Sequence, residues 1–346
     1  MKLLKSSLCG LAALLAFTLS TPALPLEKGV VPNDAKWLIH LDVDNLRDSK
    51  VGQTLINEIL AEPLAKLKTE MKVDGQLILQ KLHSVTAFGN NFEAGPKADG
   101  VLLLSGEEDL QKIVEGLLAA QMLQDTNSPI KKVQQDGFAV YSMQDQVFLS
   151  PRVAGQIVVS KSREQLEAIR NHLTGKAKAP NAGKAFSDYA HVPNAFFFLA
   201  VAEGFNEKAA LPPQARILKM AEGARIVLGE KADLLFVNLA LKAKDSEIIQ
   251  QIRQVLEGMT ALVALGQSEN KELMELMQGT KVSSTDKTVT VNIEYPLAKA
   301  MAHLNDVTKH VHKALNGNDG HAHRTKSKSK KSAEKPADAE APEPNQ

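Results

Sequence analysis

Cysteine is nearly absent from this chain. Cys9 is the single cysteine among 346 residues, and it lies in an apolar stretch near the N-terminus. Thiolates serve as enzyme nucleophiles and as ligands of iron–sulfur clusters and many zinc sites, so the sequence after residue 23 excludes these chemistries. It also excludes disulfides there, and we therefore expect a hydrophobic core alone to stabilise the fold.

Aromatic residues are scarce as well. They make up 4% of the chain, with one tryptophan, Trp37, and three tyrosines. Few rings are therefore available to stack on sugars or on the bases of single-stranded nucleic acid. The formal net charge is only +1, which selects no charged partner, and we expect no specific binding to nucleic acid.

Common catalytic motifs are missing from the sequence. The chain contains no Gly-x-Ser-x-Gly turn, no phosphate-binding loop and no His-Glu-x-x-His helix. The Ser-x-x-Lys matches at 128–131 and 284–287 lie at turns beside expected strands, where a helical nucleophile would not form. We therefore expect a non-enzymatic protein without a cofactor.

The N-terminus has the pattern of a secretory signal peptide. Two lysines precede an apolar run at 8–19, which is followed by small residues that end at Ala23. The run is too short to cross a bilayer, and no second apolar run follows it. We expect residues 1–23 to be removed during export to the periplasm or the cell exterior, which leaves no transmembrane segment and a short linker at 24–34.

Two stretches of the chain resemble each other. GPKADGVLLL (95–104) and GEKADLLFVN (229–238) share Gly-x-Lys-Ala-Asp before an apolar run. Each is followed by an amphipathic segment that contains Glu-Gly, at 109–121 and at 247–263. Self-similarity of this kind indicates an internal repeat.

The spacing of apolar residues predicts strands and single helices in the same order in both halves. Alternation or short apolar runs indicate strands at 36–43, 85–89, 100–105, 138–143, 146–150, 155–161, 195–201, 224–230, 234–243, 281–285 and 288–295. Helical spacing indicates helices at 51–71, 109–121, 163–173, 215–223, 247–263, 270–278 and 297–315. We predict an α+β fold made of two tandem copies of an antiparallel-sheet unit with helices packed on one face. The predicted boundaries are 35–175 and 194–315 for the two units, 176–193 for a linker and 316–346 for a disordered tail.

The segment AFFFLAV at 195–201 is apolar at every position. A strand of this kind needs cover on both faces. We therefore expect it to lie in the centre of its sheet and not at an edge.

The sequence VPNDAKWLIHLDVDNLRDSKVGQTL at 31–55 contains a strand-like run that ends in an aspartate pair and passes into a helix. It resembles uncharacterised exported proteins of planctomycete and verrucomicrobial type. The resemblance implies export and brings no known activity.

The aspartate pair, Asp42 and Asp44, raises the question of a metal site. A calcium loop of the EF-hand type needs oxygen ligands at positions one, three and five, glycine at six and glutamate at twelve. Counted from Asp42, the last three of these positions hold Leu46, Arg47 and Gln53, so the pattern fails. We instead expect Asp42 or Asp44 to cap the following helix by accepting hydrogen bonds from its free N–H groups.

Histidines near the C-terminus are the candidate metal ligands. His-x-His pairs in a flexible tail can bring two imidazoles to one zinc, copper or nickel ion, in a weak site. The competing interpretation is a solvated helix end and tail, in which the histidines complement the negative end of the helix dipole. The candidates are His303, His310, His312, His321 and His323.

A basic block followed by an acidic, proline-rich segment ends the chain. This tail lacks the apolar residues needed to offset the entropy of ordering, so we expect it to be disordered. Its positive charges favour electrostatic docking to an anionic polymer, and the alternative is a tail that only improves solubility. The block contains Arg324, Lys326, Lys328, Lys330, Lys331 and Lys335.

These patterns favour an exported, non-enzymatic binding or structural protein of the periplasm or cell envelope. Its expected partner is an envelope protein or an anionic polymer, and the junction of the repeats is a natural place for a ligand. Two alternatives stay open. One is a metal-binding protein that uses the histidine-rich tail. The other is a hydrolase in which Asp42, Asp44 and a histidine converge in one concave site.

Overall fold

The computed structural model describes residues 29–70, 73–91, 100–124, 128–176, 186, 192, 195–204, 220–266 and 271–304. The chain divides into one compact unit, Met1–Ala302, and a second unit, His303–Gln346. All strands discussed below belong to the first unit, and the expected signal peptide and tail lie outside the described residues.

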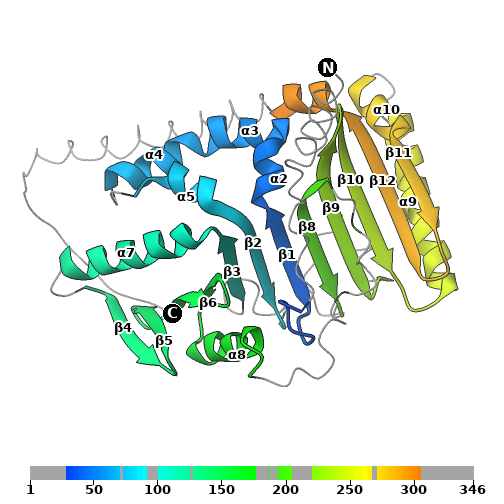
Figure 1. Ribbon diagram of the computed structural model, residues 1–346. Coiled ribbons are helices and arrows are strands. Elements are labelled where there is room, and N and C mark those ends of the chain that lie inside the picture. The colour runs from blue at the N-terminus through cyan, green and yellow to red at the C-terminus, as the bar shows by residue number, and fades with distance from the viewer. Residues whose placement is uncertain are drawn as a thin grey trace, which may run out of the picture. The chain divides into compact units, whose positions relative to one another are not determined.

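One antiparallel sheet of 12 strands organises the described part of the first unit (Figure 1). The strand order is β11-β12-β10-β9-β8-β1-β2-β3-β7-β6-β5-β4. The strands are β1 (Trp37–Asp42), β2 (Leu82–Gly89), β3 (Val101–Gly106), β4 (Ile130–Gln135), β5 (Phe138–Met143), β6 (Val147–Val153), β7 (Gln156–Ser160), β8 (Phe196–Glu203), β9 (Gly223–Lys231), β10 (Leu234–Lys242), β11 (Thr280–Ser284) and β12 (Thr288–Pro296). Antiparallel sheet and helices together agree with the predicted mixture of α and β structure.

The helices lie between strands that follow each other along the chain. They are α2 (Val43–Asp48), α3 (Lys50–Thr54), the π-helix η2 (Leu55–Ile59), α4 (Ala61–Glu70), α5 (Gly75–Lys81), α7 (Glu108–Gln124), α8 (Arg163–Leu173), α9 (Ser246–Gly266) and α10 (Lys271–Gln278). Residues 297–304 are also helical. The single helix predicted over 51–71 is therefore a series of short segments that begins earlier, at Val43, and α5 was not predicted.

The turn between α2 and α3 explains why this region is not one helix. Ser49 has an extended backbone and accepts a hydrogen bond from the Gly52 N–H through its side chain, at 2.9 Å, so it caps α3. The Leu46 carbonyl lies so close to Gly52 that any side chain there would collide with it. The chain thus changes direction at a residue that only glycine can occupy.

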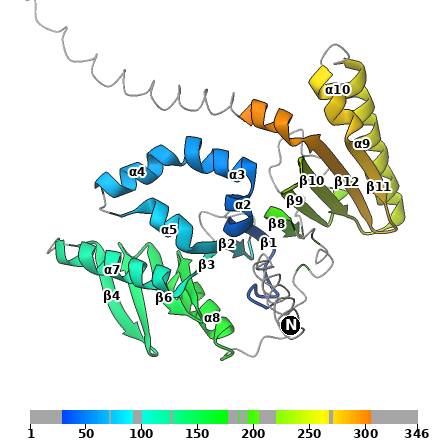
Figure 2. The same cartoon turned by 45° about the horizontal axis from the view of Figure 1, so that its top comes forward.

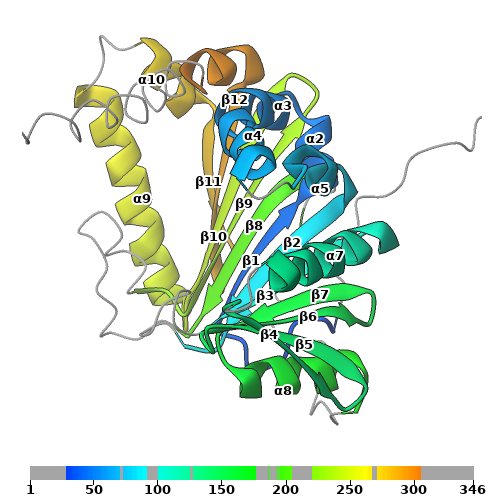
Figure 3. The same ribbon diagram turned by 90° about the vertical axis from the view of Figure 1, so that its left-hand side faces the viewer.

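The two faces of the sheet are both covered by helices in the first half of the chain. Ile157 of β7 packs with α7, whereas the next residue, Val158, packs with Leu166 and Ile169 of α8. Successive side chains of a strand point to opposite faces, so α7 and α8 lie on opposite sides of the sheet, as Figure 3 shows. The prediction that helices pack on one face is therefore wrong, because β7 is apolar on both faces.

The second half of the chain has its own core. Ile249 and Ile252 of α9 are buried against Leu241 of β10 and Val289 of β12. Figure 2 shows α9 lying alongside β11 and β12. Strand register places the sheet residues under α9 on the same face as those under α7. A series of directly paired residues connects Ile157 of β7 to Val237 of β10, which points to the same face as Leu241.

The first strands of the two halves, β1 and β8, lie side by side at the centre of the sheet. β1 pairs with β8 in antiparallel register, with Leu38 opposite Val201. The strand predicted at 195–201 is therefore central, which confirms the expectation drawn from its apolar sequence. The two expected sheets are joined into one, so the boundary between the halves lies within the sheet.

Strand β4 is an element that the sequence analysis did not predict. It forms one edge of the sheet, and Lys131, Lys132 and Val133 are all exposed. Edge strands often carry lysine, which discourages pairing with another chain. Because few side chains of β4 are buried on either face, its sequence lacks the alternation of apolar and polar residues that identifies a strand.

Candidate functional site

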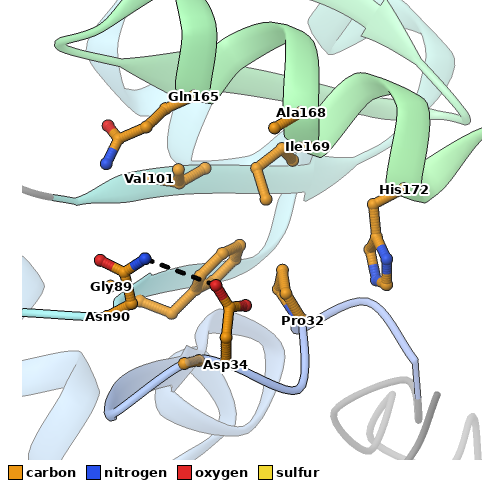
Figure 4. Close-up of a pocket in the computed structure, with 11 residues that line it drawn as sticks. Pro32, Asp34, Gly89, Asn90, Val101, Gln165, Ala168, Ile169 and His172 are labelled. Carbon is orange, nitrogen blue, oxygen red and sulfur yellow. Dashed lines mark hydrogen bonds between the residues drawn. The ribbon is translucent and has the colours of Figure 1, made fainter. Parts of the chain in front are cut away.

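A pocket of about 180 Å³ lies beside α8, and we call it the α8 pocket (Figure 4). Three parts of the chain form it: the segment that precedes β1, the adjoining ends of β2 and β3, and one side of α8. The lining residues are Pro32, Asp34, Ala35, Phe88, Gly89, Asn90, Val101, Gln165, Ala168, Ile169 and His172.

Regular secondary structure explains how these side chains meet. Phe88 and Val101 are direct partners in the β2·β3 ladder, so both point to the same face of the sheet. The α8 contribution is Gln165, Ala168, Ile169 and His172, whose spacing of three and four residues places them on one side of the helix. The pocket therefore lies between a sheet face and a helix face.

The inner part of the pocket is apolar. Phe88, Val101 and Ile169 are 3%, 5% and 6% exposed and belong to the main hydrophobic core. Ala35, at 7% exposed, adds to this surface from the segment before β1. A ligand with an apolar body would gain free energy by covering this surface, at roughly 25 cal/mol per Å².

Polar side chains surround the opening. The Asn90 amide donates a hydrogen bond to the Asp34 carboxylate at 3.4 Å, and both side chains are exposed. Gln165 Oε1 accepts a hydrogen bond from Ser160 Oγ at 3.0 Å, and His172 Nε2 lies 2.6 Å from the Gly29 carbonyl oxygen. Because a carbonyl oxygen only accepts, His172 carries its proton on Nε2. Within the described part of the chain, Asp34 is the one acidic residue that lines the pocket.

Asp42 or Asp44 was predicted to cap the helix, and Asp42 is the cap of α2. Its Oδ1 accepts a hydrogen bond from the Asn45 N–H at 2.8 Å, and its Oδ2 accepts one from the Asn45 side chain at 3.1 Å. Asn45 also donates to the Phe196 carbonyl at 2.8 Å, which ties the start of α2 to β8. Asp42 is only 2% exposed, and burial raises the pKa of its carboxyl.

Asp44 has different partners from Asp42. Its carboxylate forms an ion pair with Arg47 and lies 2.8 Å from His83 Nδ1. Arg47 in turn donates to the carbonyls of Leu79 and Gln80 near the end of α5. Asp44 therefore links α2 to the end of α5 through Arg47. Neither Asp42 nor Asp44 lines the α8 pocket.

A buried histidine lies at the centre of the sheet. His40 on β1 is 2% exposed, and its Nδ1 is 2.8 Å from Thr86 Oγ1 on β2. Burial lowers the pKa of this imidazole to about 4. Among the described residues, Nε2 has no hydrogen-bond partner. His40 is therefore neutral near pH 7. On β1 it lies between Leu38 and Asp42, whose side chains point to the same face of the sheet.

The candidate metal ligands of the tail fall almost entirely outside the described residues. His303 is exposed in the helical segment 297–304, while His310, His312, His321 and His323 are outside the described ranges. In the part of the chain that is described, no group of three histidine, cysteine, aspartate or glutamate side chains is placed to hold a metal ion. Metal binding by the tail thus remains a prediction.

None of the helices within the described ranges combines the length and apolar character needed to cross a bilayer. This agrees with the expectation of no transmembrane segment for that part of the chain.

Comparison with known proteins does not show a family. No family model matches the chain, and no curated protein matches it. Among solved structures, crystal form III of TP0453 has 12% sequence identity and a TM-score of 0.45, and the match covers 78% of this chain and 93% of that one. Crystal form I has 12% identity and a TM-score of 0.41, over 84% of this chain and 98% of that one. Similarity at this level carries no inference about the present chain.

The α8 pocket was not found by sequence reasoning. One side of α8 carries two polar residues, Gln165 and His172, with the apolar Ala168 and Ile169 between them. This pattern was the only indication in the sequence that α8 could line a pocket. The contribution of Asp34 could not be foreseen, because only the folded chain brings the segment before β1 against α8.

Proposed function

We propose that the protein is an exported, non-enzymatic binding protein of the periplasm or cell envelope, and that the α8 pocket holds a small ligand. The observation that supports this proposal is the combination of a buried apolar surface with a polar opening. Binding sites for small molecules commonly have this composition. The signal-peptide pattern at 1–23 supports export.

The rim favours one class of ligand. The Asp34 carboxylate is exposed at the opening and is the only acidic group among the described residues that line the pocket. A protonated amine on the ligand would pair with this carboxylate while the apolar body covers Phe88 and Ile169. We therefore propose a compact apolar amine, with Asn90 and Gln165 as further hydrogen-bonding groups.

Phenethylamine and phenylacetate provide a matched pair of probes, because both carry a phenyl ring on a short chain and their charges are opposite. We expect calorimetry or NMR to show phenethylamine binding with a dissociation constant of about 0.1–1 mM, as suits a ligand of this size, and much weaker binding of phenylacetate. Ala168→Leu should abolish binding by filling the pocket, whereas Ala119→Leu on α7 should not change it. Equal binding of both probes, or binding unaffected by Ala168→Leu, would contradict the proposal.

The geometry favours this function over the hydrolase alternative. A carboxylate hydrolase needs Asp42 and Asp44 to converge with a histidine in a concave site. Asp42 instead bonds to Asn45, and Asp44 to Arg47 and His83.

The strand order supports the further proposal that the chain is a tandem duplication of one α+β unit. Read outward from the centre, one half runs β1-β2-β3-β7-β6 and the other runs β8-β9-β10-β12-β11. The long helices α7 and α9 occur at the same step, directly after β3 and β10. The additional hairpin β4-β5 then belongs to the first half alone.

A further inference from the structure

Two side-chain amides lie on opposite sides of the opening of the α8 pocket, as Figure 4 shows. Asn90 directly follows β2, and Gln165 belongs to the first turn of α8. Asn90 uses its amide nitrogen to donate to Asp34, and Gln165 uses its amide oxygen to accept from Ser160. The opening therefore presents an amide oxygen on Asn90, which accepts hydrogen bonds, and an amide nitrogen on Gln165, which carries two N–H donors.

An acceptor that faces a donor is the complement of a peptide group. A trans peptide group carries one N–H and one C=O, which point in roughly opposite directions. A peptide group placed between Asn90 and Gln165 would donate to the first and accept from the second. A simple amine has no carbonyl group that could accept from Gln165.

The charge of the pocket selects the N-terminal end of a peptide. Among the described residues that line it, Asp34 is the only acidic residue and none is lysine or arginine. The Asp34 carboxylate pairs with an ammonium group and repels the carboxylate at the C-terminal end of a chain. Because Asp34 is hydrogen-bonded to Asn90, an ammonium at Asp34 lies next to the group that receives the first peptide N–H.

The size of the pocket limits it to one side chain. Its volume is about 180 Å³, and an apolar protein cavity of about 150 Å³ holds one benzene molecule. The buried part, formed by Phe88, Val101 and Ile169, therefore accommodates one side chain of the size of leucine or phenylalanine. The remainder of a peptide must leave through the opening.

We propose that the α8 pocket binds the N-terminal residue of a peptide that begins with an apolar side chain. This inference rests on the proposed function and narrows its ligand from an amine to the N-terminus of a peptide. The α-ammonium pairs with Asp34, and the first side chain packs against Phe88 and Ile169. The first peptide group lies between Asn90 and Gln165. Later residues lie outside the pocket, so binding depends on how the peptide begins and not on its length.

Calorimetry on the full chain with two matched probes tests the proposal. Leucyl-alanine amide and 3-methylbutylamine share the side chain and the ammonium, but only the former has a peptide group after the first residue. We expect leucyl-alanine amide to bind about tenfold more tightly, because it gains two hydrogen bonds at the opening. Equal binding of the two probes would overturn this inference and leave the proposed function intact. Binding of neither probe, nor of phenethylamine, would contradict both.

Two further peptides test which residue occupies the pocket. N-acetyl-leucyl-alanine amide lacks the ammonium, and alanyl-leucine amide has its leucine in second place. Each should bind at least about tenfold more weakly than leucyl-alanine amide, because the first loses the pairing with Asp34 and the second leaves the apolar part of the pocket largely unfilled. A tetrapeptide amide that begins with leucyl-alanine should bind as tightly as the dipeptide amide. Equal binding of alanyl-leucine amide would overturn the proposal.

Substitutions at the opening separate the two polar contacts. Asp34→Asn should weaken binding of leucyl-alanine amide and of 3-methylbutylamine by about tenfold or more, because both carry the ammonium. Asn90→Ala should lower the preference for the peptide from about tenfold to about threefold, because it removes the acceptor of one hydrogen bond. Asn57→Ala, at an exposed residue of η2, is the matched control and should leave the preference unchanged. An unchanged preference in Asn90→Ala would contradict the placement of the peptide group.

Discussion

His40 Nδ1 on β1 lies 2.8 Å from Thr86 Oγ1 on β2, and the histidine is 2% exposed in the middle of the sheet. A neutral imidazole can form this hydrogen bond, but a protonated one would place a charge in a site with little solvent. This explains why burial lowers the pKa of His40 from 6.5 to about 4.

The first prediction is that stability falls in mild acid. Between pH 6.5 and pH 4 the unfolded chain protonates His40 while the folded chain keeps it neutral, so the unfolded state binds more protons. The free energy of unfolding should therefore fall as the pH is lowered through this window, by about 3 kcal/mol in total from this residue. Urea unfolding at a series of pH values measures the change.

The paired substitution His40→Leu with Thr86→Val provides the control for this prediction. It removes both polar partners together and so leaves no new buried polar group without a hydrogen bond. Its free energy of unfolding should depend less steeply on pH than that of the natural chain. The same slope in both proteins would show that His40 does not cause the acid sensitivity.

The second prediction concerns the cap of α2. Asp42→Ala should lower the free energy of unfolding by about 1–2 kcal/mol, because the Asn45 N–H loses its acceptor. Asp42→Asn keeps an acceptor and removes a carboxylate whose pKa is raised by burial. A raised pKa means that stability is lost as the pH rises through it, so the asparagine variant should be equally or more stable at pH 7. Chemical denaturation compares the three proteins, and a strongly destabilised asparagine variant would contradict a simple capping role.

The third prediction concerns the β4-β5 hairpin. Arg170 of α8 is 1% exposed, lies 2.7 Å from the Asp136 carboxylate and donates to the Gln135 carbonyl at 3.2 Å. Removing the negative charge leaves a buried guanidinium without its anion, so Asp136→Asn should cost about 2 kcal/mol although the Asp136 side chain is 59% exposed.

Arg170→Leu is the informative comparison for this hairpin. It removes the buried charge and places an apolar side chain near Phe138, whose ring centre is now 5.0 Å from the guanidinium carbon. We expect it to cost less than Asp136→Asn, because replacing a buried charge by a packed apolar group is often nearly neutral. Thermal unfolding of both variants gives the order, and the reverse order would show that the arginine contributes mainly through packing or its bond to Gln135.

The fourth prediction concerns the histidine-rich tail. If its histidines bind metal, zinc titration of the full chain should show stoichiometric binding that is lost in a chain ending at Ala302, the end of the first unit. Binding should also weaken below about pH 6, because imidazoles must be neutral to coordinate. Zinc retained by the shortened chain would place the site in the folded body, and no binding by the full chain would remove the metal hypothesis.

The fifth prediction tests the duplication. A fragment that ends at Gly175 and a fragment that begins at Ala195 should associate when mixed, because β1 and β8 each present an unpaired edge when separated. Size-exclusion chromatography measures the complex. Leu199→Pro removes a ladder hydrogen bond in the middle of the pairing, opposite His40. It should weaken association more than Glu203→Pro, which removes only the bond from the Glu203 N–H to the Lys36 carbonyl at the end of the pairing. Equal association of both variants would argue against pairing through β8.

Local elements could be read from the sequence more readily than their arrangement. An aspartate cap at Asp42 or Asp44 was predicted from the neighbouring residues, and the structure shows that Asp42 is the cap. The central position of β8 was predicted from its uniform apolar character. The sharing of one sheet by the two halves depends on the pairing of Leu38 with Val201, which no local pattern encodes. The α8 pocket was missed for the same reason, since Asp34 and His172 come from distant parts of the chain.

The central pairing of β1 with β8 also affects the order of folding. Contacts between residues so far apart in sequence close large loops, and proteins rich in such contacts fold slowly. During synthesis, β1 keeps one unpaired edge until β8 has emerged, so the first half passes through a stage at which it can pair with another chain. A chaperone that shields this edge would act before the second half arrives.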